Sequence, residues 1–176
     1  MIQIKNSIIL VLLVLLPALA NSASIYETQA EFLGRAFGNS IPDSRAIWLS
    51  GERKSTVRKL LDHDYPALRA RYWCQGGRSA WILDEIGKEL PITVGVIVEK
   101  DFIRSLRVLT YRENRGGEVV SPAFTDQFNE VGLKNDQTLD TKIDGISGAT
   151  LSVKALSRLA TMALFLHSES DCSNDL

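Results

Sequence analysis

The sequence predicts an α+β domain in which a central antiparallel sheet is flanked by helices. Two features predict the sheet: short apolar runs follow one another between residues 69 and 111, and the connections between these runs are short. A third feature predicts a C-terminal helix, because apolar residues recur at helical spacing over residues 149–167. No linker or internal repeat divides the chain, so we expect a single domain over residues 24–168.

The individual elements follow from the spacing of the apolar residues. Helical spacing predicts a first helix over residues 26–37, which Gly38 ends, and a second helix over residues 52–62. A short apolar run over residues 46–49 predicts a strand between these two helices. The further expected strands cover residues 71–74, 79–83, 92–99 and 102–111.

The segment between the sheet and the last helix, residues 112–148, is the least regular part of the chain. It contains several glycines, a proline and a polar run, and only residues 123–129 have a helical pattern. Long loops on a rigid scaffold often carry functional residues, so we expect the functional site here. The polar tail, residues 169–176, is expected to be loose.

The first 20 residues have the pattern of a cleavable export signal. Lys5 precedes an apolar run over residues 8–16, Pro17 ends this run, and small residues follow at positions 18 and 20. We expect cleavage after residue 20, or as late as residue 23. The alternative is an uncleaved membrane anchor, but the apolar run is shorter than the ~20 residues that span a bilayer. The sequence therefore predicts a soluble exported protein of the periplasm.

Charge and composition exclude several classes of function. The 20 basic and 21 acidic residues nearly balance, so we do not expect nucleic acid as a partner. In an oxidising compartment, Cys74 and Cys172 either form a disulfide or remain as two thiols, and the sequence leaves both possibilities open. His63 and His167 lack the spacing of metal ligands, so no metal site is expected. No nucleophile and base are recognisable as a pair, so no catalytic residue is assigned.

The adjacent Asp84 and Glu85 are candidates for a paired-carboxylate site. Neighbouring residues on a strand point to opposite faces of the sheet, so these two carboxylates are not expected to act together. We therefore expect both to be solvated at the surface.

The most informative stretch stands directly before the C-terminal helix. It consists of Asp144, Gly145, Ile146, Ser147, Gly148, Ala149 and Thr150. Ser147 is a plausible N-cap, Gly148 allows the backbone to approach a ligand, and the amides of Ala149 to Leu151 are expected to be free donors. Such an arrangement suits a phosphate group. The alternative is an ordinary helix capped by Ser147, with Thr150 as an exposed hydroxyl and Asp144 as a turn residue.

This stretch resembles the signature of the FMN-binding domain family, Asp-x-x-(Ser/Thr)-Gly-Ala-Thr. Members of that family include flavin-bearing subunits of the Rnf and sodium-pumping NADH:quinone reductase complexes, and stand-alone exported domains. In the family, a Mg-dependent flavin transferase takes FMN from FAD and joins it to the last threonine as a phosphoester. The resemblance implies that Thr150 is the acceptor and Asp144 the acid used in modification. It also implies that Ser147, Gly148 and Ala149 shape the turn around the phosphate.

The resemblance extends beyond the signature. The loop at residues 111–118 and the short helical segment at residues 124–128 stand in the family's order before the signature. The family's Glu-Thr-Pro-Gly is replaced here by Glu113, Asn114, Arg115 and Gly116, so the two middle residues differ. The likeness covers about residues 73–166, and the helices before it are expected to be an N-terminal elaboration of the same domain.

The flavin ring is expected to lie against the loop that follows the last strand. Glu113 and the backbone of Gly116 and Gly117 are candidates for contacts with the ring, because a tight turn offers amide donors there. Arg115 is a candidate for neutralising a reduced, anionic flavin. The alternative is a plain surface loop with a solvated arginine. Large aromatic residues in strands usually belong to the core, so no stacking role is assigned to Trp48, Trp73 or Trp81.

We expect an exported redox carrier that holds its FMN covalently, with the N-terminus of the C-terminal helix at the FMN phosphate. Its expected partners are the flavin transferase and a membrane or periplasmic redox protein, either quinone-linked or haem-containing. One alternative is an FMN-dependent reductase that acts directly on a small molecule, with a proton donor beside the ring. The other is a non-redox module that binds a phosphate-bearing ligand, which would be a colourless protein.

Overall fold

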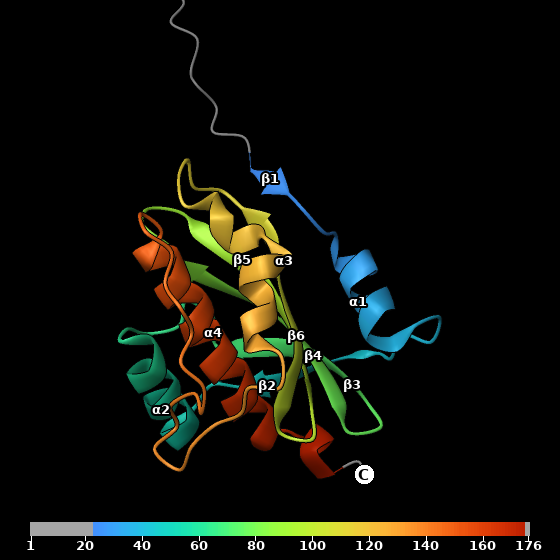
Figure 1. Ribbon diagram of the computed structural model, residues 1–176. Helices are drawn as coiled ribbons and strands as arrows, with labels where there is room; N and C mark the ends of the chain where they lie inside the picture. Colours follow the sequence, from blue (N-terminus) through green and yellow to red (C-terminus); the bar gives the residue numbers. More distant parts are fainter. Residues whose placement is uncertain (1–22, 175–176) are drawn as a thin grey trace, which may run out of the picture.

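A computed structural model describes residues 23–174 and has the predicted α+β architecture (Figure 1). The strands are β1 (Ser24–Ile25), β2 (Ser44–Trp48), β3 (Arg69–Gln75), β4 (Arg78–Ile86), β5 (Pro91–Glu99) and β6 (Phe102–Tyr111). The α-helices are α1 (Gln29–Phe37), α2 (Gly51–Leu61), α3 (Pro122–Thr125) and α4 (Thr150–Ser168). Short 3₁₀ helices are η1 (Gly117–Val120), η2 (Asp126–Phe128) and η3 (Asp171–Asn174). The expected export signal, residues 1–20, lies outside the described residues.

The strands form one antiparallel sheet in the order β1-β6-β5-β4-β3-β2. Strands β3 to β6 are joined by short hairpin connections, as the sequence predicts, so each strand pairs with the next one along the chain. The turn between β5 and β6 consists of Lys100 and Asp101, which both have positive φ angles of 53° and 65°. Consecutive left-handed residues of this kind match the right-handed twist of a hairpin.

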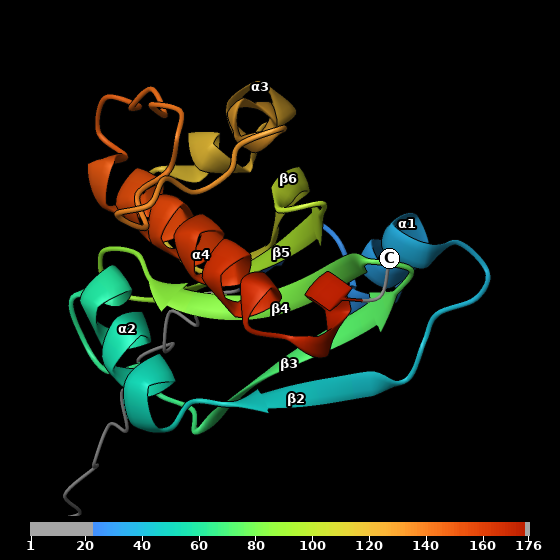
Figure 2. The ribbon, with the colours of Figure 1, turned by 90° about the horizontal axis from the view of Figure 1, so that it is seen from below.

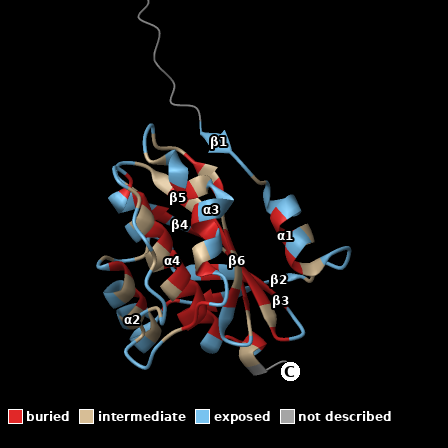
Figure 3. Cartoon of the chain, viewed as in Figure 1, coloured by how far each residue is buried: buried red, intermediate tan, exposed pale blue. Residues whose placement is uncertain are grey.

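Helix α4 lies across one face of the sheet with α2 beside it, as Figure 2 shows. The described residues that are buried concentrate along the strands and α4, whereas α2 is exposed over most of its surface (Figure 3). Among the apolar residues that recur at helical spacing in α4, the structure buries Leu156, Leu159, Ala163 and Leu166. Val153 is only partly covered. Because α4 rests on the central strands, its position is fixed by the main core.

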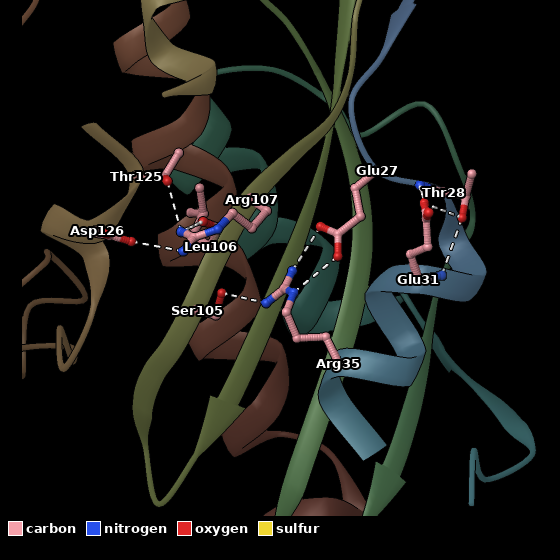
Figure 4. A network of polar contacts seen from close by, with 9 residues as sticks. All are labelled: Glu27, Thr28, Glu31, Arg35, Ser105, Leu106, Arg107, Thr125 and Asp126. Carbon is pink, nitrogen blue, oxygen red and sulfur yellow. Dashed lines mark hydrogen bonds and ion pairs between the residues drawn. The ribbon is translucent and has the colours of Figure 1, made fainter. Parts of the chain in front are cut away.

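Helix α1 covers the opposite face of the sheet through a second cluster of apolar residues. Phe32 packs so closely on β5 that a Cβ atom at Gly95 would lie 2.5 Å from its ring. Arg35 of α1 pairs with Glu27 and donates a hydrogen bond to the Ser105 hydroxyl on β6, at 2.7 Å (Figure 4). Apolar packing and these polar contacts therefore join the N-terminal segment to the sheet.

The start of α1 differs from the prediction. The helix begins at Gln29 rather than at residue 26, because Thr28 caps it: the Thr28 hydroxyl accepts from the Glu31 backbone N–H, and the Glu31 carboxylate accepts from the Thr28 backbone N–H. Tyr26, expected on the buried face of the helix, is instead 54% exposed. Ser24 and Ile25 form β1 against β6.

The polar tail is not loose over its described part. Cys172 lies in η3, is fully buried, and forms a disulfide with Cys74 of β3, with the two Cα atoms 5.7 Å apart. Ser170 is buried as well, and its hydroxyl donates to the His167 carbonyl at 2.7 Å. The sequence left the pairing of the cysteines open, and the structure pairs them. Within residues 23–174, no helix is both long and apolar enough to span a bilayer.

Candidate functional site

The N-terminus of α4 is the centre of the candidate site. The helix begins at Thr150, its N-cap is Ala149, and no side chain caps it. Ser147 is exposed and does not act as the predicted cap, because Gly148 adopts a left-handed conformation (φ 83°) and moves the start of the helix further along the chain. The first helical hydrogen bond runs from the Val153 N–H to the Ala149 carbonyl, at 3.0 Å. The amides of Thr150, Leu151 and Ser152 are therefore free donors at the positive end of the helix dipole. The Ala149 amide, which was also predicted to be free, instead donates to the Ile146 carbonyl at 3.0 Å.

Thr150 presents its side chain at this helix end. The residue is exposed, and no described residue makes a hydrogen bond to its hydroxyl. Leu151 beside it is 49% exposed, which is unusual for a large apolar side chain and leaves the surface around the hydroxyl open. The hydroxyl is therefore accessible to a reacting group.

A cavity of about 430 Å³ opens against the first turn of α4. Its walls are formed by Lys88, Glu89, Glu113, Asn114, Arg115, Gly148, Ala149, Thr150, Leu151 and Ser152. This volume lies in the range of cavities that hold small ligands and cofactors. The cavity thus brings together two segments that the sequence analysis singled out, the signature and the loop after β6.

Four predicted site residues do not line the cavity. Asp144 and Ser147 are exposed and lie outside it, and Gly117 begins η1 and lines a different hollow beside Tyr26. Gly116 lies behind the cavity wall rather than in it: a Cβ atom there would come within 3.0 Å of the Tyr111 hydroxyl. Gly116, with φ 81°, therefore serves close packing.

Glu113 lines the cavity, where the ring contact was predicted, and it also has a structural role. One of its carboxylate oxygens accepts hydrogen bonds from the backbone N–H groups of Lys88, Glu89 and Leu90, at 2.6, 2.6 and 3.0 Å. Burial alone would raise the pKa of Glu113, but these backbone donors outweigh it and lower the pKa below its ordinary value. The carboxylate thus holds the β4–β5 loop in place as one wall of the cavity.

Lys88, Glu89 and Ser152 are site residues that the sequence analysis missed. The sequence did contain a signal for Lys88 and Glu89, because every second connection of an antiparallel meander lies at the same end of the sheet. The β4–β5 loop and the loop after β6 are such connections. Ser152 lies 3.0 Å from the Tyr111 hydroxyl, which donates to the Arg115 carbonyl at 2.5 Å. These contacts join the loop after β6 to the first turn of α4.

Gln127 fixes the segment that leads into α4. Its side-chain oxygen accepts a hydrogen bond from the Asp144 backbone N–H at 2.8 Å. The flanking Phe124 and Phe128 are buried and meet edge to face, with ring centroids 5.9 Å apart. The short helical segment at residues 124–128, noted in the sequence, therefore contacts the signature.

Glu85 contradicts the expectation of a solvated carboxylate, whereas Asp84 is exposed as expected. Glu85 is only 3% exposed, because α4 covers its face of β4. One of its oxygens lies 2.8 Å from Nε2 of His63 and 3.5 Å from a guanidinium nitrogen of Arg158. The carboxylate lies outside the cavity and joins the end of α2 to α4.

None of the three tryptophans lines the cavity. Trp73 and Trp81 belong to the two cores, and Trp81 stacks on Tyr72 with ring centroids 4.7 Å apart. Trp48 is 56% exposed at the edge strand β2, with the Arg69 guanidinium 5.8 Å from its ring centroid. Among residues 23–174, no group of three or more His, Cys, Asp or Glu side chains is placed to hold a metal.

The residues present fit FMN. The free amides at the start of α4 can donate hydrogen bonds to the phosphate. There is room for the phosphate beside the left-handed Gly148, because a Cβ atom there would meet nothing within 4 Å. Cationic Lys88 and Arg115 and the amide-bearing Asn114 line the adjoining cavity, where a polar ring edge needs partners.

Comparison with known proteins agrees with this assignment. Residues 87–164 match the model of the FMN-binding domain family. This range begins at the β4–β5 loop, ends within α4 and includes every residue that lines the cavity. No curated protein matches the chain. The family match and the fit of the cavity together assign residues 87–164 to the FMN-binding domain family.

Proposed function

We propose that Thr150 carries FMN through a phosphoester bond and that the protein is an exported electron-transfer flavoprotein. The observation that carries this proposal is the accessible Thr150 hydroxyl, which has no partner among the described residues and stands beside free amides at the cavity. In the attachment step, the Thr150 oxygen forms a bond to the FMN phosphorus of FAD. The pyrophosphate bond breaks, AMP leaves, and the hydroxyl proton is released. A flavin transferase is the proposed catalyst.

The chain's own residues then have separate tasks. The first-turn amides of α4 hold the phosphate, and Glu113 keeps the β4–β5 loop in place as a wall of the cavity. Arg115 lines the cavity and would be the cation available to favour an anionic reduced flavin, since Lys88 is paired with Glu89 at 3.4 Å. Bound FMN supplies the reversible redox chemistry. The proposed partners are a quinone-linked or haem-containing protein of the membrane or periplasm.

The Cys74–Cys172 disulfide supports export. Disulfides form and persist in oxidising compartments such as the bacterial periplasm and are rare in the cytosol. Covalent attachment suits such a location, because a flavin lost outside the cytoplasm is not resupplied. The periplasm is therefore the proposed location.

The test is the intact mass and visible absorbance of protein produced with the flavin transferase, after denaturation removes loosely held cofactors. We expect one FMN-phosphoryl group on the wild type and none on Thr150→Ala. Thr141→Ala, at another exposed threonine nine positions earlier, is the matched control and should load fully. A colourless, unmodified wild type would refute the proposal and favour a module that binds another phosphate-bearing ligand.

A further inference from the structure

The segment before α4 is held to the rest of the fold by few contacts. Residues 141–148 are mostly exposed, and Ile143 and Ile146 are only partly buried against the core. Between residues 141 and 147, the hydrogen bond from the Asp144 N–H to Gln127 is the only one in the described structure that reaches another element. The conformation of the signature therefore depends on this one side chain more than on any other polar group.

The residues on both sides of Gln127 are held in place by the rest of the fold. Arg107 of β6 donates to the Thr125 hydroxyl at 2.8 Å and pairs with Asp126 at 2.9 Å, as Figure 4 shows. Thr125 is fully buried, and so is Phe128 on the other side of Gln127. The sheet, through Arg107, thus fixes the two residues directly before Gln127. The hydrogen bond between the Gln127 side chain and the Asp144 N–H therefore also holds the backbone at Asp144 in place.

We propose that Gln127 is a positioning residue for FMN attachment: its side-chain oxygen holds the backbone at Asp144 so that the segment leading to Thr150 has the conformation the flavin transferase accepts. This inference rests on the proposed function. The attachment step is the one given above, in which the Thr150–phosphorus bond forms as AMP leaves. Gln127 makes no contact with the reacting atoms and acts only through the backbone of Asp144.

Loss of this contact is expected to free the signature without unfolding the protein. Helix α4 is held by its own apolar face, and the hydrogen bond at Gln127 lies outside the core. In Gln127→Leu, which keeps the side chain's bulk but removes the acceptor, the Asp144 N–H has no protein partner. In Gln127→Glu, a carboxylate oxygen still accepts this hydrogen bond. Comparing the two variants therefore distinguishes the effect of the hydrogen-bond acceptor from the effect of side-chain size.

The experiment measures the rate of FMN attachment to purified, unmodified protein with the flavin transferase, FAD and Mg²⁺, followed by intact mass. We expect Gln127→Leu to load about fivefold more slowly than wild type, the effect of losing one ordinary hydrogen bond. Gln127→Glu should load at close to the wild-type rate. Gln29→Ala, at an exposed glutamine on the other face of the sheet, is the matched control.

Amide hydrogen exchange at Asp144 provides a readout that does not depend on flavin. Exchange should be faster in Gln127→Leu than in wild type and should be unchanged in Gln127→Glu. Equal loading rates for wild type and Gln127→Leu would overturn the inference while leaving the proposed function intact. A wild type that never loads would overturn both.

Discussion

The two ends of α4 differ in how the rest of the protein surrounds them. At the C-terminal end, His167 is 1% exposed, its Nδ1 lies 2.7 Å from the Ser79 hydroxyl, and the chain continues into the disulfide-bonded η3. At the N-terminal end, Thr150 is exposed and no side chain caps the helix. The C-terminal end of α4 is thus buried and bonded to its surroundings, and we call it the closed end. The N-terminal end is exposed and uncapped, and we call it the open end. Contacts at the closed end hold α4 in the fold. The backbone N–H groups at the open end can therefore remain unpaired and available to a ligand.

Breaking the closed end should have the largest effect on stability. The double variant C74A/C172A is expected to lose about 2–5 kcal/mol of unfolding free energy, because the disulfide closes a long loop of the unfolded chain. Urea unfolding measures this loss. FMN attachment, assayed at a temperature where the variant is folded, should stay within about twofold of wild type. A folded variant that fails to load would show that the two ends are not independent.

Crowding the open end should have an intermediate effect. Gly116→Ala places a Cβ atom 3.0 Å from the Tyr111 hydroxyl and 3.2 Å from the Ser152 hydroxyl, at a positive φ angle. We expect a loss of roughly 1–3 kcal/mol of unfolding free energy from overpacking and backbone strain. Gly117→Ala is the control, because its Cβ atom would lie 4.0 Å from Cε1 of Tyr111 and its φ angle is not positive. Equal unfolding free energies for the two variants would contradict this prediction.

The contact between His63 and Glu85, which Arg158 in the middle of α4 also approaches, gives the smallest predicted effect, and this effect depends on pH. The Glu85 carboxylate raises the pKa of His63 above its ordinary value of 6.5, and the Asp64 carbonyl adds to this effect. Protonated His63 therefore stabilises the fold fully below pH 6.5, and this contribution is lost as the pH rises through the folded-state pKa.

The comparison of His63→Gln with wild type tests this effect. The variant should be less stable than wild type at about pH 5.5, and the difference should shrink by about pH 9. Urea unfolding at the two pH values measures it. A difference that is the same at both values would show that His63 contributes by packing rather than by charge.

The sequence predicted the fold where the pattern is local. Strands β3 to β6 and helix α4 were predicted because alternation and helical spacing are visible within ten to twenty residues. Strand β1 has only two residues, too few to form a pattern. The anchoring of the tail was not predicted, because it depends on Cys172 meeting Cys74 across a separation of 98 residues.

The candidate site was predicted in part for the same reason. Gly148 was identified because the start of a helix is a local signal, and Thr150 was identified because the stretch resembles the FMN-binding signature. The burial of Glu85 was missed because it depends on which face of β4 the helix α4 covers, and alternation alone does not tell the two faces apart. The role of Glu113 depends on a loop more than twenty residues away in the chain.

The disulfide also makes part of this protein a covalent ring. The chain from Cys74 to Cys172 is closed on itself, and the whole segment that matches the FMN-binding family lies inside this closed loop, together with Thr150. A protease that cuts once within the ring opens it but releases no fragment. A cofactor attached to Thr150 would therefore stay with the rest of the molecule after such a cut, until the disulfide is reduced.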